Sequence, residues 1–211
     1  MGLVAPQPAQ APHAAHPAPR LRVLSLNIGR CQRLHIGERS VLSGIGKRPV
    51  SGPMAVARLG LEGDEQADLS AHGGLDKAVY AYPAQHYAFW HDARRQRGLG
   101  LPDETLPPGF MGENLTVEGL LESEVYVGDR LHFPHCVLRV TAPREPCYKF
   151  DAVMGFALAG RTMARAGNCG YYLAVDQPGS IAAGQEAWLQ PGQRALSIAQ
   201  AIAGKWAKHA R

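Results

Sequence analysis

TAPREPCYKF, residues 141–150, is the stretch around which we expect the fold to be arranged. The run before it, residues 136–140, is mostly apolar and has the composition of a strand. Pro143 and Pro146 then fix the backbone angle φ and cannot donate hydrogen bonds, so regular strand pairing is expected to stop there. We therefore predict that Cys147 lies on a stiff, irregular turn directly after a strand.

The side chains beside Cys147 are cationic. Arg144 and Lys149 favour the thiolate form of a nearby cysteine, and the thiolate is the form that attacks electrophiles or binds soft metals. The alternative is that Cys147 is a small buried hydrophobic residue, as many cysteines without a disulfide are. The rigid prolines and the flanking cations favour the reactive interpretation.

The composition is that of an ordinary globular protein. The chain has 211 residues, which is enough for one full hydrophobic core and short for two large domains. Its 24 glycines and 16 prolines favour a loop-rich, strand-rich fold over a helical bundle. No apolar run reaches the roughly 18 residues that a membrane span needs, so we expect no membrane partner.

Charge and cysteine content argue against several classes of function. The net charge is +4, but lysines and arginines are scattered without a long basic run, so we expect no nucleic-acid partner. A pocket for an anionic small molecule fits the same charge. The four cysteines form no CxxC pair, which argues against a zinc site or a thioredoxin-like site. Because no secretory signal is recognisable, we expect thiols in a reducing cytoplasm.

Three segments are expected along the chain. Residues 1–20 are rich in proline and contain no acidic residue, which predicts a disordered tail. Residues 21–195 are expected to form the folded domain. Residues 196–211 are expected to form a C-terminal amphipathic helix, although Gly204 weakens it.

Alternating polar and apolar residues over 22–28, and further short apolar runs separated by glycines and other turn residues, predict a series of strands. The expected strands are residues 22–28, 54–57, 78–82, a strand reached through 111–117, and then 136–140, 171–175 and 187–189. A hairpin is expected over residues 125–133, with its turn at Gly128-Asp129. The fold class predicted from these patterns is mostly β with some α.

Two further helices are predicted. The first covers residues 83–97, because Pro83 suits a first helical turn and Gly98 suits a helix end. The second covers residues 154–166 and is expected to end at Gly167.

Three turns carry side chains suited to a binding site. They are His72-Gly73-Gly74-x-Asp76-Lys77, Gly112-Glu113-Asn114 and Arg144-x-Pro146-Cys147. Adjacent glycines expose backbone N–H groups and allow a ligand to approach closely, while Lys77, Arg144 and Lys149 supply positive charge. Each turn also has a structural alternative, since histidine, aspartate and asparagine often satisfy polar groups of their own loops.

Together these motifs resemble a known family. The segments that carry the resemblance are LEGDEQAD (61–68), HGGLDKA (72–78), YPAQHY (82–87), GENL (112–115), VGD (127–129) and PREPCYK (143–149). In this order they resemble the YiiM-like group of MOSC-domain proteins, named after the C-terminal domain of molybdenum cofactor sulfurase. The resemblance runs from about Leu21 to about Gln190.

The resemblance implies a MOSC β-barrel, a mixed and mainly antiparallel barrel with a few flanking helices. It also implies that Cys147 matches the cysteine that ligates molybdenum in the molybdenum cofactor (molybdopterin), or that bears a persulfide in sulfur-carrying relatives. Relatives of the first kind reduce N-hydroxylated compounds such as hydroxylaminopurines and amidoximes. A molybdenum-dependent oxidoreductase is therefore expected. The alternatives are a persulfide carrier or cofactor-handling protein, and a binding module in which Cys147 belongs to the core.

Other candidate residues take roles around the cofactor within this resemblance. Lys47, Lys77 and Arg144 are candidates for the pterin phosphate, and Asn114 for hydrogen bonds to the pterin edges. The remaining candidates for the cofactor site are His72, Gly73, Gly74, Asp76 and Lys149.

The source of electrons is expected to be a separate protein. Longer YiiM-like members carry a further three-helix module, which is thought to serve partner recognition or electron delivery, whereas this sequence has room for one helix after the barrel. The sequence contains no iron–sulfur or flavin motif. The expected partners are therefore a small N-hydroxylated substrate and a separate electron-donor protein.

Overall fold

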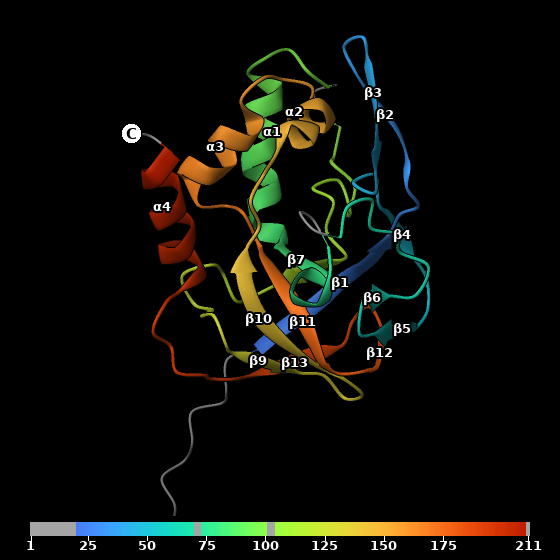
Figure 1. Cartoon of the computed structure of the whole chain (residues 1–211), viewed down its shortest axis with the longest axis vertical. Helices are drawn as coiled ribbons and strands as arrows, with labels where there is room; N and C mark the ends of the chain where they lie inside the picture. The colour runs from blue at the N-terminus through green and yellow to red at the C-terminus, as the bar shows by residue number, and fades with distance from the viewer. Residues whose placement is uncertain (1–19, 70–72, 101–103, 210–211) are drawn as a thin grey trace, which may run out of the picture.

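The structure is a computed structural model that describes residues 20–69, 73–100 and 104–209. Within these residues, seven strands form a closed mixed barrel and four α-helices pack outside it (Figure 1). This confirms the predicted fold class. The predicted tail up to residue 19 and His72 lie outside the described residues. Arg20, predicted to end that tail, is instead the first residue of the first strand.

The barrel follows one continuous order of strands. The strands are β1 (Arg20–Ile28), β7 (Val79–Pro83), β8 (Leu115–Glu118), β9 (Arg130–His132), β10 (Val137–Pro143), β11 (Tyr171–Gln177) and β13 (Glu186–Gln190). Their spatial order is β13-β9-β10-β11-β7-β8-β1, and β1 pairs with β13 to close the barrel. All these neighbours are antiparallel except β7 and β8, which are parallel.

Six further strands among the described residues are short and lie outside the closed barrel. Strand β4 (Arg48–Val50) pairs with the end of β1. A small sheet contains β5 (Met54–Ala57), β6 (Gly60–Leu61) and β12 (Gly179–Ile181). Strands β2 (Gln32–Ile36) and β3 (Arg39–Ser43), which the sequence did not predict, form a separate hairpin that projects beyond the barrel (Figure 1).

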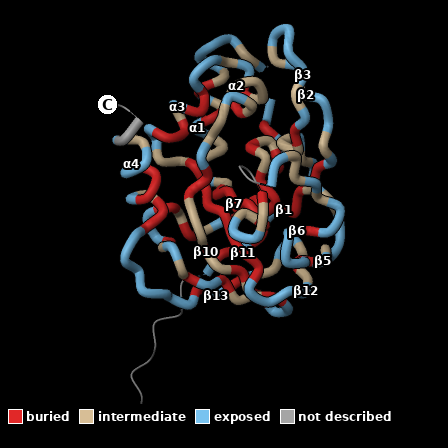
Figure 2. Tube along the Cα trace, in the orientation of Figure 1, coloured by how far each residue is buried: buried red, intermediate tan, exposed pale blue. Residues whose placement is uncertain are grey.

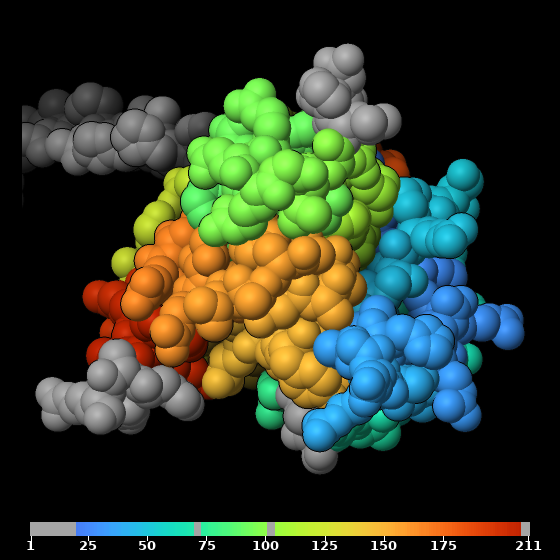
Figure 3. All heavy atoms as spheres, turned by 90° about the horizontal axis from the view of Figure 1, so that it is seen from above, coloured from blue at the N-terminus to red at the C-terminus, as the bar shows by residue number. Residues whose placement is uncertain are grey.

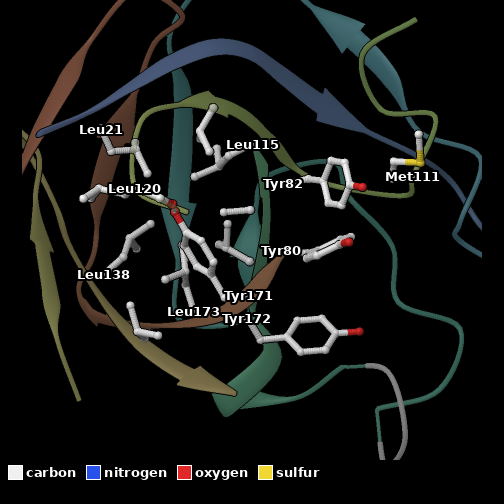
Figure 4. Close-up of a cluster of buried hydrophobic side chains, with 14 of the residues drawn as sticks. Leu21, Tyr80, Tyr82, Met111, Leu115, Leu120, Leu138, Tyr171, Tyr172 and Leu173 are labelled. Carbon is white, nitrogen blue, oxygen red and sulfur yellow. Dashed lines mark hydrogen bonds between the residues drawn. The ribbon is translucent and has the colours of Figure 1, made fainter. Parts of the chain in front are cut away.

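Alternation along the strands sends neighbouring side chains to opposite faces of the barrel wall. Tyr171 points among Leu21, Leu120 and Leu138, whereas Tyr172 points to the opposite side (Figure 4). The red, buried parts of the chain follow the barrel strands and the inner sides of the helices (Figure 2). The wall of β7 and β11 is therefore buried on both faces.

The helices gather on one side of the barrel (Figure 1). They are α1 (Tyr87–Arg95), α2 (Tyr148–Met154), α3 (Ala159–Ala166) and α4 (Ile198–His209). Trp90 on α1 is fully buried, its ring centroid lies 5.3 Å from that of Phe150 on α2, and its Nε1–H donates to the Tyr82 hydroxyl. These contacts fix α1 and α2 against the tyrosine-bearing face of β7. No helix in the described ranges is long and apolar enough to cross a membrane.

The helix predicted over residues 83–97 is shorter than expected. Pro83 ends strand β7, and a 3₁₀ turn, Ala84–His86, comes before α1. Because Pro83 pairs with Val117 of the parallel strand β8, its backbone stays extended and cannot start a helix.

The helix predicted over residues 154–166 was wrong in its start, and helix α2 before it was not predicted. Met154 is the last residue of α2, and α3 begins only at Ala159, because Gly155 has a φ of 80° and Leu158 a φ of 65°, both outside the helical region. The Asp151 carboxylate accepts the N–H groups of Leu158 and Gly160, which fixes the start of α3. Gly167 ends α3 as predicted.

The hairpin predicted over residues 125–133 was also wrong. Tyr126 forms an isolated bridge with Ser197, and β9 pairs with β10 and β13. The turn itself is present, since the Asp129 N–H donates to the Tyr126 carbonyl and Gly128 has a φ of 94°. The residues on either side of this turn do not pair with each other as a hairpin, because β9 already pairs with β10 on one edge and with β13 on the other.

Candidate functional site

A pocket lies where the end of β10, the start of α2 and two loops near β1 converge. It brings together six of the predicted residues: Lys47, Lys77, Asn114, Arg144, Cys147 and Lys149. The rest of its lining consists of Ser43, Gly44, Ile45, Asp64, Glu65, Gln66, Ala67, Asp68, Tyr80, Gly112 and Tyr172. Residues that are widely separated in sequence therefore share one polar, partly cationic cavity.

Cys147 stands at the start of helix α2. Its backbone is extended, with φ −124° and ψ 176°, and its carbonyl accepts the Phe150 N–H at 2.8 Å. The expectation that pairing stops at the first proline was wrong, because β10 runs through Pro143, which lies opposite Tyr171. The irregular turn is thus limited to residues 144–146, and the Cys147 side chain is half-buried at the pocket.

Arg144 is a buried cation in the pocket wall. The residue is 6% exposed, and its guanidinium lies 4.6 Å from the Phe150 ring centroid and 5.4 Å from that of Tyr80. Its Nη1 donates to the Met163 sulfur at 3.2 Å. Within the part of the chain described, no carboxylate forms an ion pair with Arg144. A buried cation without a carboxylate partner makes the pocket favourable for an anion.

The charge of Arg144 acts on Cys147. Burial on its own lowers the pKa of Arg144, but attraction to Tyr80, Tyr172 and Cys147 outweighs burial, so the pKa is raised above its ordinary value. The guanidinium therefore remains charged. Because the attraction is mutual, the same cation favours the thiolate form of Cys147.

Lys47 is tied into a buried network. Its ammonium pairs with Asp64, and the two side chains are 8% and 3% exposed. Asp64 also accepts the Gly29 N–H and the Asn114 Nδ2–H, both at 2.9 Å. The Asn114 Oδ1 accepts the Tyr80 N–H at 3.1 Å. Lys47 and Asn114 thus hold one wall of the pocket in place.

Lys77 and Lys149 are half-buried cations of the pocket. The Lys77 ammonium lies 5.7 Å from the centroid of the Tyr172 ring. The Lys149 ammonium donates to the carbonyl of Leu42 at 2.9 Å, which links α2 to the β2–β3 hairpin. With Arg144, they leave the Cys147 side of the pocket rich in positive charge.

The remaining described candidates support the pocket from outside its lining. Gly73 is buried, and a Cβ atom there would lie 2.2 Å from Oε1 of Gln66. The Gly74 N–H donates to the same oxygen at 2.9 Å. Asp76 is exposed, and its carbonyl accepts the Thr141 hydroxyl at 2.5 Å. The glycines thus allow the loop to close over Gln66, which itself lines the pocket.

Comparison with known proteins identifies the family. The MOSC domain model matches residues 68–187. The chain belongs to the MOSC domain family. The matched residues include Cys147 and three cations of the pocket, Lys77, Arg144 and Lys149.

Relatives of this MOSC chain span most of its length. YflK, an uncharacterized protein of Bacillus subtilis strain 168, is 38% identical over 180 residues, covering 85% of this chain and 78% of YflK. YiiM of Escherichia coli K12 is 35% identical over 167 residues, covering 78% of this chain and 71% of YiiM. A protein named reductase in Gibberella moniliformis is 32% identical over 171 residues, covering 80% of this chain and 29% of the reductase.

A solved structure agrees with the MOSC fold. The crystal structure of YiiM from Geobacillus stearothermophilus aligns with a TM-score of 0.70 and 29% identity, covering 90% of this chain and 86% of that chain. The predicted resemblance to YiiM-like MOSC proteins is confirmed.

The four cysteines of this MOSC chain differ in their surroundings. Burial raises the pKa of Cys136 to about 12 and raises that of Cys169 further above its ordinary value. Burial and the nearby carboxylate of Glu65 raise the pKa of Cys31. Cys147 is the cysteine that the pocket places beside cations, which sets it apart chemically from the other three.

The donor atoms of the MOSC pocket fit a cofactor-borne metal better than a metal held by protein alone. No group of three His, Cys, Asp or Glu side chains in the described ranges could hold a metal ion. Cys147 offers one soft sulfur ligand, so the other ligands must come from a bound group. Arg144, Lys77 and Lys149 suit an anionic group such as a phosphate.

Sequence reasoning missed Asp64, Gln66, Tyr80 and Tyr172 as pocket residues. Tyr80 and Tyr172 become neighbours because β7 and β11 pair with these two residues in register, and their ring centroids lie 5.4 Å apart. The short apolar runs predict both strands but not which strands pair. Asp64 and Gln66 were within a quoted family segment, but no local pattern assigns a role to either side chain.

Proposed function

We propose that this MOSC protein binds the molybdenum cofactor through Cys147 and reduces N-hydroxylated compounds with electrons from a separate protein. The observation that carries the proposal is a half-buried thiol in a pocket beside Arg144, a buried cation with no carboxylate partner among the described residues. Membership of the MOSC family and a relative named reductase support an oxidoreductase.

In this proposal each pocket residue has a chemical role. The Cys147 sulfur is the protein ligand of the metal, and Arg144 and Lys77 neutralise the cofactor phosphate. Lys149 extends the same cationic side, while Asn114 and Lys47 fix the opposite wall. When bound, the cofactor would supply the two-electron redox chemistry that reduction of an N–OH group needs. The overall reaction consumes two electrons and two protons and releases the amine and one water.

Metal content of purified protein tests the cofactor part of the proposal. Wild type, Cys147→Ser and a matched control, Cys31→Ser, are expressed in a host that makes the molybdenum cofactor. We expect about one molybdenum per chain in wild type and in Cys31→Ser, and almost none in Cys147→Ser, because the metal loses its only protein sulfur. Wild-type protein purified without molybdenum would refute the proposal.

An activity assay tests the reaction. Hydroxylaminopurine is supplied with reduced viologen as an artificial electron donor, and formation of the aminopurine is followed. Turnover by wild type and Cys31→Ser, lost in Cys147→Ser, is the expected result. If metal-free wild type instead releases thiocyanate on treatment with cyanide and Cys147→Ala does not, the protein is a persulfide carrier and the reductase proposal is wrong.

A further inference from the structure

The positive charge of the chain is concentrated in one segment. Residues 30–48 contain five cationic residues and one acidic residue, so the segment has a net charge of +4. The whole chain also has a net charge of +4, which means that the rest of the sequence is neutral overall. The segment comprises the β2–β3 hairpin and the residues on either side of it.

Four of these cations face solvent. Arg30, Arg33, Arg39 and Arg48 are exposed, and none of them pairs with a carboxylate in the described part of the chain. The fifth, Lys47, is neutralised by Asp64 and belongs to the pocket wall. Exposed charges of one sign that have no internal partner attract an oppositely charged molecule over a distance of about one Debye length, roughly 8–10 Å.

The hairpin is physically joined to the pocket. The chain leaving β3 supplies Ser43, Gly44 and Ile45 to the pocket lining. The Lys149 ammonium, two residues after Cys147, donates to the Leu42 carbonyl on β3. Seen from above, the blue hairpin region lies directly against the α2 region (Figure 3). A protein seated on the hairpin would therefore lie beside the pocket that holds Cys147.

We propose that the β2–β3 hairpin is the docking surface for the electron-donor protein, and that the donor presents an acidic face to it. This inference rests on the proposed function, because a reductase of this kind needs external electrons. Leu42 is 54% exposed and lies directly opposite Arg33 in the hairpin, and arginine beside an apolar side chain is typical of protein interfaces.

A protein partner fits the hairpin better than a nucleic acid does. Residues 30–48 contain no phenylalanine, tyrosine or tryptophan, whereas single-stranded nucleic acid is usually held by aromatic side chains that stack on its bases. The β2–β3 hairpin also projects from the molecule and borders the pocket that holds Cys147. A donor protein bound there would lie close to the pocket, as electron transfer requires.

Binding of an acidic redox protein tests the inference without any turnover. The probe is a plant-type [2Fe–2S] ferredoxin with a negatively charged surface, and its affinity for the full chain is measured by calorimetry at low and high salt. Arg33→Glu/Arg39→Glu is expected to weaken binding at low salt by at least about tenfold, since both changes replace attraction with repulsion. Wild-type affinity should fall with added salt, and the variant's should not.

The matched control changes the same charge elsewhere. Arg161 and Arg165 are exposed on α3, outside the pocket lining, and neither forms an ion pair with a described residue. Arg161→Glu/Arg165→Glu should therefore bind ferredoxin like wild type. Equal weakening in both double variants, or tighter binding of a single-stranded oligonucleotide than of ferredoxin by wild type, would overturn the inference.

Electron transfer separates this inference from the proposed function. With reduced viologen, Arg33→Glu/Arg39→Glu should turn over like wild type, whereas with reduced ferredoxin at low salt its second-order rate constant should fall by about tenfold or more. If wild type does not turn over the substrate with reduced viologen, the proposed function is wrong. Unchanged ferredoxin affinity and rate in the hairpin variant counts against the docking surface alone.

Discussion

At the scale of single residues, charge distinguishes two cysteines near the same pocket. Cys147 shares the pocket with Arg144, Lys77 and Lys149, whereas the Cys31 N–H donates to Glu65, whose carboxylate disfavours a thiolate there. Both thiols are half-buried, so access to solvent alone does not separate them. Burial of the Cys31 thiol and the neighbouring Glu65 carboxylate together raise its pKa, whereas Cys147 lies beside cations.

Alkylation should therefore select Cys147. With iodoacetamide at about pH 8, we expect Cys147 to react first, Cys31 more slowly, and the buried Cys136 and Cys169 only after unfolding, because the thiolate is the reactive form. Peptide mass spectrometry over a time course measures the four rates. Equal rates for all four would mean that the pocket gives Cys147 no special reactivity.

Removing the buried partner of Lys47 should destabilise the fold. Asp64→Asn leaves the Lys47 ammonium in a nearly sealed site without its carboxylate, and breaking a buried pair in this way lowers the free energy of unfolding by about 3–5 kcal/mol. Urea denaturation measures the change. The control is Asp92→Asn, which breaks the exposed pair with Arg95 and should have little effect. A small effect of Asp64→Asn would mean that water reaches the pair.

At the scale of elements, the ends of helices and strands were harder to predict than their centres. The alternation in residues 22–28 predicted β1, which exposes part of its outer side, and the apolar run 171–175 predicted β11, which is buried on both faces there. The start of α3 was predicted too early because Leu158 adopts a left-handed conformation that the sequence does not signal. The pocket required the pairing of β7 with β11, which no local pattern contains.

Two glycine substitutions with opposite expected effects test the end of α3 and the interior of α4. Gly167 has a φ of 74° and no neighbour within 4 Å of an added Cβ, so Gly167→Ala should lower the free energy of unfolding by about 1 kcal/mol through backbone strain alone. Gly204 also has open space but lies inside α4 without a positive φ, so Gly204→Ala should raise it by about 0.5–1 kcal/mol. Thermal unfolding followed by circular dichroism measures both. A change of the same sign in both variants would contradict either the end of α3 at Gly167 or the helical conformation of Gly204.

Two ion pairs to Asp176 link strands β9, β10 and β11, and their contribution to stability depends on pH. Burial alone would raise the pKa of Asp176 on β11, but hydrogen bonds from Arg130 on β9 and Arg139 on β10, each 3.0 Å, lower it below its ordinary 3.8. The folded state thus favours the carboxylate. Its contribution to stability is present above about pH 4 and is lost as the pH falls through the lowered pKa.

Asp176→Asn should remove this acid-sensitive component. Wild type is expected to lose more stability than the variant when denaturation is compared at about pH 5 and about pH 2. The Asp176 carboxylate takes up a proton between these pH values, whereas the amide that replaces it in the variant does not. Glu186→Gln, which breaks an exposed pair with Arg20, is the matched control and should follow wild type. Parallel curves for wild type and Asp176→Asn would show that the contact adds nothing.

At the scale of the whole molecule, the barrel interior should dominate stability. Leu115 on β8 is fully buried, whereas Leu24 on β1 is 43% exposed on the outer surface. Leu115→Ala should lower the free energy of unfolding by about 2–5 kcal/mol, because the cavity cannot be filled by its neighbours. Leu24→Ala should change it far less. Chemical denaturation of the two variants gives the comparison, and similar losses would mean that the barrel interior is loosely packed.

Closure of the barrel by β1 and β13 also sets an order of events during biosynthesis. Arg20 lies opposite Trp188, so β1 cannot pair with β13 until the ribosome has added the residues between them. At ~5–20 residues per second this takes about ten to thirty seconds. The cavity gathers residues from Ser43 to Tyr172 and is equally incomplete until late in translation. Any prosthetic group it receives must be loaded onto a nascent chain that is almost finished or already released.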